Sequence, residues 1–159
     1  MVRDLCIAIA VSKPESLDPV AGAIPSARRL LAWAHAVGYD TELVADEDPA
    51  VPVTCARLRE VFARKLGQGG QRRLIVSFAG HGLIRGGAEE YWLLNGWRTQ
   101  ATKAVNYLKL RDRLGTYRPR QLAVVSDACR SLPTPQAKWV EGNGVVDVKD
   151  YVENPVQIA

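Results

Sequence analysis

The chain alternates between short apolar runs and longer segments in which apolar residues recur at helical spacing. Asp4–Val11 is a nearly continuous apolar run, the pattern of a strand that is covered on both faces in a parallel sheet. Further strands are predicted at 41–45, 73–79 and 121–126, and a short one at 91–94 within a loop that runs from Arg85 to Gly96.

Three helices are predicted between these strands. Apolar positions between Ile24 and Val37 follow helical spacing, with Ser26 as the N-cap and Gly38 as the end. A second helix opens at Thr54 and ends at Gly67; its apolar face consists of Leu58, Val61, Phe62 and Leu66. A third helix fits from about residue 106 to residue 117.

Strands that alternate with helices imply right-handed crossovers, and therefore an α/β fold with a mostly parallel sheet and helices on both faces. We expect one domain over residues 1–159, with its core at about 4–131 and a mostly irregular tail at 132–159. In such sheets, functional sites gather at the carboxyl ends of the strands. His81 and Cys129 both directly follow predicted strands.

Composition narrows the class of protein. The chain is 47% hydrophobic and 24% charged, as in ordinary globular domains, and has neither a membrane-length apolar run nor an N-terminal leader pattern, which predicts a cytoplasmic protein. The net charge of +4 comes partly from arginine pairs such as Arg28-Arg29 beside apolar segments, which favours solvated surfaces over nucleic-acid binding.

The three cysteines, Cys6, Cys55 and Cys129, form no CxxC pair and have no histidine at metal-ligand spacing, so we predict neither a disulfide framework nor a metal site. Cys6 lies in a strand and Cys55 at the start of a helix, which is typical of small buried side chains. Cys129 differs, because polar residues surround it at the end of a strand.

A cysteine and a histidine at two strand ends can form a nucleophile and its general base, since an imidazole takes the thiol proton or stabilises the thiolate. The separation of 48 positions from His81 to Cys129 leaves room for a strand excursion, a helix and a return strand. Gly80 and Gly82 let the backbone approach a substrate closely. The amides of Gly82 and Cys129 are candidates for an oxyanion hole.

The segments SFAGHG at 77–82 and DACRS at 127–131 resemble the His and Cys motifs of caspases and metacaspases. Caspases also place the histidine about 50 residues before the cysteine. The resemblance covers about residues 5–131 and is closest to bacterial metacaspase-like proteins. It implies a three-layer caspase-like fold and a cysteine endopeptidase with the dyad His81 and Cys129, in which the amides of Gly82 and Cys129 form the oxyanion hole.

Two positions depart from the caspase signature, which has Gln two residues before the cysteine and Gly two after; here they are Asp127 and Ser131. An acid at the first position resembles metacaspases, in which it lines the primary specificity pocket and selects Arg or Lys before the scissile bond. Ser26 aligns with a second metacaspase acid. Alternatively, Asp127 only caps a turn or pairs with Arg130.

Caspase-like domains continue beyond the cysteine with further strands, whereas this chain extends thirty residues past Cys129. We therefore expect the C-terminal strands to be missing or on another chain, so that protein substrates and such a small-subunit-like segment are the expected partners. No cofactor is predicted; metacaspases are often calcium-dependent, but Asp46-Glu47-Asp48 is too short a signal for a calcium site.

Two other functions compete with the endopeptidase. One is a catalytically silent caspase fold that serves as an interaction module. The other is a nucleotide-binding doubly wound domain in which Gly80 and Gly82 cradle a phosphate, although neither GxGxxG nor GxxxxGK[ST] follows the first strand.

Overall fold

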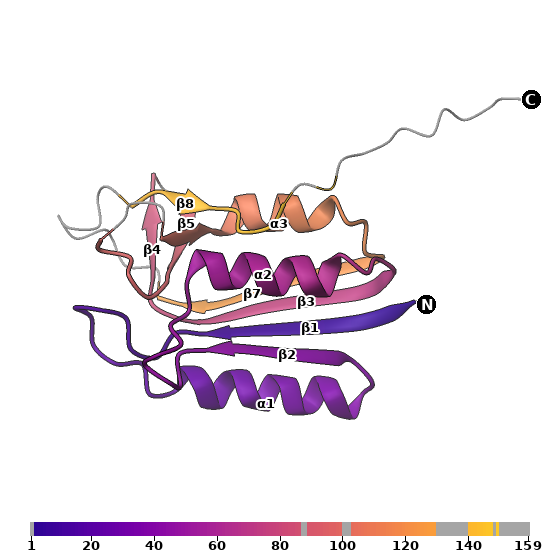
Figure 1. Cartoon of the computed structure of the whole chain (residues 1–159), viewed down its shortest axis with the longest axis horizontal. Helices are drawn as coiled ribbons and strands as arrows, with labels where there is room; N and C mark the ends of the chain where they lie inside the picture. Colours follow the sequence, from indigo (N-terminus) through magenta and orange to yellow (C-terminus); the bar gives the residue numbers. More distant parts are fainter. Residues whose placement is uncertain (1, 87–88, 100–102, 130–139, 148, 150–159) are drawn as a thin grey trace, which may run out of the picture.

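A computed structural model describes residues 2–86, 89–99, 103–129, 140–147 and 149. It has an α/β architecture, as predicted (Figure 1). In chain order the elements are β1 (Arg3–Ala10), α1 (Ala23–Ala36), β2 (Asp40–Ala45), α2 (Cys55–Leu66), β3 (Gln71–Gly80), β4 (Gly82–Arg85), β5 (Glu89–Leu93), β6 (Ala104–Asn106), α3 (Tyr107–Gly115), β7 (Gln121–Ala128) and β8 (Gly142–Asn143).

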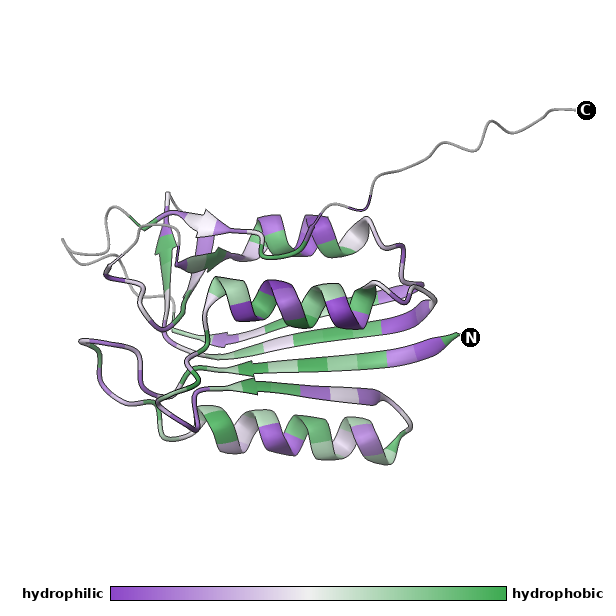
Figure 2. Cartoon of the chain, in the orientation of Figure 1, coloured by the Kyte–Doolittle hydropathy of each residue, from purple (hydrophilic) through white to green (hydrophobic). Residues whose placement is uncertain are grey.

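The main sheet has the strand order β2-β1-β3-β7, and all three pairings are parallel. β1 and β3 are the central strands, and Figure 2 shows hydrophobic residues along most of their length. Parallel strands that are covered on both faces need apolar side chains in both directions, which is why their sequences read as continuous apolar runs. The predicted parallel sheet is confirmed.

Helices cover both faces of this sheet. Alanines of α1 pack on Ala8 and Ala10, whereas Leu58 and Phe62 of α2 share a core with Ile7 and Ile9 on the opposite face, where α3 also packs. Figure 1 shows the same arrangement, with α1 on one side of the strands and α2 and α3 on the other. None of the helices in the described residues is both long and apolar enough to cross a membrane.

A second, four-stranded sheet was not predicted. Its order is β4-β5-β6-β8, with antiparallel pairing of β4 with β5 and of β5 with β6. Of these strands only β5 was expected, as a short strand at 91–94. β4 and β6 have only four and three residues, too few for a periodic pattern to identify. Val140, Val145 and Val146 are buried, so buried residues continue past residue 131.

The predicted helix ends agree with the structure at Thr54, Gly67 and Gly38 and differ at Ser26. Thr54 caps α2 by accepting a hydrogen bond from the Arg57 amide at 3.2 Å, and Gly38, with φ +89°, follows the end of α1. Ser26 is not an N-cap, because α1 begins at Ala23 with Gly22 in that position. Pro25 is compatible with the earlier start, since the first helical turn needs no amide donor there.

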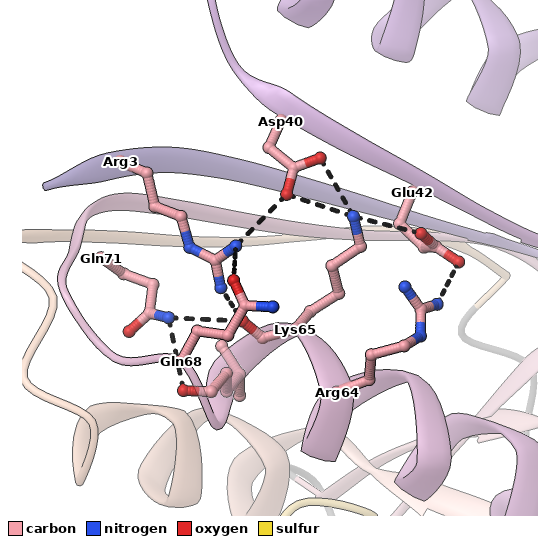
Figure 3. A network of polar contacts seen from close by, with 8 residues as sticks. Arg3, Asp40, Glu42, Arg64, Lys65, Gln68 and Gln71 are labelled. Atoms are coloured by element: carbon pink, nitrogen blue, oxygen red, sulfur yellow. Dashed lines mark hydrogen bonds and ion pairs between the residues drawn. The ribbon is translucent and has the colours of Figure 1, made fainter. Parts of the chain in front are cut away.

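A network of ion pairs joins α2 to the sheet at the amino ends of its strands (Figure 3). Lys65 lies 3.0 Å from Asp40 and 3.3 Å from Glu42, and Arg3 lies 3.4 Å from Asp40. Lys65 is in the last turn of α2, where a cation also interacts favourably with the helix dipole. These contacts secure the end of the sheet that is remote from His81 and Cys129.

Substitution of Thr54 and of Ser26 by alanine is a matched test of which residue caps a helix. Thr54→Ala should lower the free energy of unfolding by about 1 kcal/mol, because it removes a bonded N-cap. Ser26→Ala should change it by at most about 0.5 kcal/mol, because Ser26 lies inside α1. Urea unfolding of both variants measures the difference; equal losses would contradict the assigned start of α1.

Candidate active site

The carboxyl ends of β3 and β7 bring the predicted dyad together. In the parallel pairing of these strands Gly80 lies opposite Ala128, and His81 and Cys129 are the next residues of the two chain segments. The Cys129 Sγ lies 3.6 Å from the His81 Nδ1. At this distance the thiol is within reach of an imidazole nitrogen that can accept its proton.

The loop between β1 and α1 orients the imidazole from its other side. His81 Nε2 lies 2.7 Å from the backbone oxygen of Asp18. A carbonyl oxygen only accepts, so Nε2 carries the proton and donates it, which leaves the Nδ1 lone pair toward the sulfur of Cys129. Sequence reasoning missed Asp18, and no residue-type signal exists for it, because the contact uses a backbone oxygen that every residue has.

The surroundings of His81 favour its protonated form. Burial of the ring works to lower the pKa of His81, but the hydrogen bond to Asp18 and the contact and charge of the Cys129 sulfur outweigh it, so that this pKa is raised above its ordinary value. The site therefore stabilises an imidazolium at His81.

Gly82 lies directly against the sulfur. Its amide donates to Cys129 Sγ at 3.5 Å, and the thiol donates to the Gly82 carbonyl oxygen at 3.4 Å. The Gly82 amide thus lies beside the sulfur of Cys129, while the oxyanion role of Gly82 and Cys129 stays a prediction.

The sequence suggested that Gly80 and Gly82 allow a substrate to approach the backbone. The structure shows a different reason for these glycines, which is the packing around them. A Cβ on Gly82 would lie 2.8 Å from the Ala128 Cβ and 2.9 Å from the Cys129 carbonyl oxygen. A Cβ on Gly80 would lie 2.9 Å from the Phe78 ring. At Gly82 the missing side chain therefore lets the segment after β3 lie close to the end of β7, whereas at Gly80 a side chain would meet the Phe78 ring of the same strand.

A cavity of about 470 Å³ opens beside the dyad; its lining includes His81, Cys129, Asp127, Ser26 and Arg29. Asp127 and Ser26 also line an adjoining cavity of about 410 Å³ between α1 and β7. Asp127 and Ser26, the two positions that the resemblance to metacaspases singled out, thus line the same cavity as Cys129. Arg130, the alternative partner of Asp127, is outside the described residues.

The other two cysteines are buried, as predicted. Burial raises the pKa of the Cys6 thiol to about 11 and also raises that of Cys55. Both thiols are therefore poor nucleophiles, whereas Cys129 is exposed. Within the part of the chain that the structure describes, no three His, Cys, Asp or Glu side chains are grouped so as to hold a metal ion.

Comparison with known proteins finds neither a matching family model nor a matching curated protein. The functional assignment therefore depends on the geometry of the two strand ends and on the chemistry of the side chains there.

Substitution of Gly82 tests how closely the strand ends must approach. Gly82→Ala should lower the free energy of unfolding by about 1–3 kcal/mol through overpacking. It should also slow iodoacetamide alkylation of Cys129 by about tenfold or more, because the amide donor moves away from the sulfur.

Gly115→Ala is the matched control, since a Cβ on Gly115 meets nothing within 4 Å. Alkylation is followed by intact mass and unfolding by urea titration. Unchanged alkylation of folded Gly82→Ala protein would contradict a role for this amide at the sulfur.

Proposed function

We propose that the chain is the catalytic part of a caspase-like cysteine endopeptidase, closest to the metacaspases. The observation that carries the proposal is the 3.6 Å approach of Cys129 Sγ to His81 Nδ1, with Nε2 held 2.7 Å from a backbone carbonyl. The parallel sheet with helices on both faces is compatible with a caspase-like fold. A nucleophile, a base and a group that orients the base are the parts that covalent catalysis requires.

The reaction then proceeds through an acyl-enzyme. Nδ1 of His81 takes the thiol proton, and the thiolate of Cys129 attacks the carbonyl carbon of the scissile peptide bond. The amides of Gly82 and Cys129 stabilise the oxyanion, and the imidazolium returns its proton to the leaving amine. Water hydrolyses the thioester with His81 again as base, which restores the thiol.

Asp127 gives this endopeptidase its preference for Arg or Lys before the scissile bond. Its side chain is exposed and lines both cavities beside the dyad. The cavity between α1 and β7 is also lined by Ala27, Leu30 and Val125, apolar side chains that suit the methylene stem of a basic residue. A carboxylate at this place repels an acidic substrate side chain.

A further chain segment, from the C-terminal side or from a second chain, completes the sheet at β7. Among the described strands, β7 pairs only with β3 and is an edge of the main sheet. Val125 of β7 is 49% exposed and lines the cavity between α1 and β7. An unpaired edge beside an exposed apolar side chain is a site for another strand to add.

A positional library of fluorogenic peptides against the full chain tests the proposal. We expect hydrolysis after Arg and Lys that is absent from Cys129→Ala. Asp127→Asn should lower kcat/KM for basic substrates about 10- to 150-fold, the equivalent of about 1.5–3 kcal/mol for hydrogen bonds to a charged group.

Asp112→Asn is the matched control, because Asp112 on α3 is 71% exposed and pairs with Arg111. Hydrolysis after Asp would overturn the pocket assignment. Lack of any Cys129-dependent hydrolysis would overturn the endopeptidase and favour an interaction module, for which the open edge of β7 would be the relevant surface.

A further inference from the structure

A buried carboxylate lies beneath the loop that carries Asp18. Asp46, which directly follows β2, is 6% exposed. Its Oδ1 accepts from the Ser12 amide at 2.7 Å and from the Ser12 hydroxyl at 2.9 Å, and its Oδ2 accepts from the Lys13 amide at 2.9 Å. Ser12 and Lys13, the first two residues after Val11, are thus both hydrogen-bonded to the side chain that directly follows the neighbouring strand β2.

Asn95 extends these contacts to the segment after β5. Its Nδ2 donates to Asp46 Oδ2 at 3.3 Å and to the Lys13 carbonyl oxygen at 3.2 Å. Its Oδ1 accepts from the Val53 amide at 2.7 Å, and its own amide donates to the Val53 carbonyl oxygen at 3.0 Å. Asp46 and Asn95 therefore tie together the segments that follow β1, β2 and β5.

Hydrogen bonds on both sides of Asp18 hold the remainder of the loop. The Trp97 Nε1 donates to the Glu15 carbonyl oxygen at 3.0 Å, and the Val20 amide donates to the Ser12 carbonyl oxygen at 2.8 Å. Asp18 lies between Glu15 and Val20, so the oxygen that accepts from His81 is on a segment held on both sides. The bond from Val20 returns directly to Ser12, which Asp46 fixes.

We propose that Asp46 is a positioning residue for His81, acting by fixing the loop whose Asp18 carbonyl orients the imidazole. The meaning of this orientation for catalysis rests on the proposed function, whereas the contacts do not. Burial works to raise the pKa of Asp46, but the hydrogen bonds from Ser12, Lys13 and Asn95 outweigh it and hold this pKa below its usual range. The carboxylate therefore stays ionised, the form that accepts from all of these donors at once.

Asp46→Asn in the full chain tests the proposal. An amide keeps the size of the side chain but presents an NH₂ group to one set of donors, so the Ser12–Lys13 segment must shift. We expect a smaller fraction of the Nε2-protonated tautomer and a lower pKa for His81, both read from ring nitrogen shifts in NMR. The chain has two histidines, so His35→Gln assigns the signals. Alkylation of Cys129 should slow about tenfold.

Asp4→Asn is the matched control. Asp4 is also buried, at 7% exposed, and Arg72 holds its pKa below the usual range through a hydrogen bond, but Asp4 lies at the amino end of β1. Both variants should lose stability to urea, and only Asp46→Asn should change the tautomer of His81. Unchanged His81 signals in folded Asp46→Asn protein, or equal changes in both variants, would overturn the proposal.

Ser12→Ala separates loop position from charge. It removes one donor to Asp46 while leaving the carboxylate, so a lower pKa of His81 in this variant reports the Asp18 contact and not a lost negative charge. If Asp46→Asn fails to fold, Ser12→Ala decides the question: a smaller change in the same direction supports positioning, and no change overturns it. Since these signals need no substrate, a chain without peptidase activity would contradict the proposed function alone.

Discussion

The parallel pairing of β3 with β7 is the interaction on which the candidate site depends. Its register sets Gly80 opposite Ala128, so the two segments of the chain leave the sheet side by side with His81 and Cys129 as their next residues. A slip of one residue would turn each side chain to the other face of the sheet. Gly82 contributes to this pairing, because the space it leaves empty is filled by Ala128 and the carbonyl of Cys129.

One part of the molecule sets the position of His81, and another part sets the orientation of its imidazole ring. β3 positions His81, but the oxygen that fixes its tautomer belongs to the loop after β1, and that loop is bonded to Asp46 after β2 and to Trp97 after β5. The segments that follow β1, β2 and β5 are therefore all connected to the loop that contacts the imidazole of His81. Most of these contacts use backbone atoms, which makes the shape of the loop more important than the identity of its residues.

The sequence was informative where long patterns or special residue types decide the structure. Buried strands such as β1 and β3 read as apolar runs, Thr54 is a capping residue by type, and strand ends marked His81 and Cys129. The three-residue β6 has no measurable periodicity, and its pairing depends on tertiary contacts. Asp18 acts through a carbonyl oxygen, and Asp46 reads as one acid among several in a polar loop, so neither could be predicted.

Covalent labelling of the full chain with an arginyl acyloxymethylketone tests the pairing of nucleophile and base most directly. The reagent reacts with an activated thiolate, and peptide mapping by mass spectrometry locates the adduct. We expect one adduct, on Cys129, that forms much more slowly in folded His81→Ala protein. An unmodified Cys129 in the folded wild-type chain, or the same labelling rate without the imidazole of His81, would contradict it.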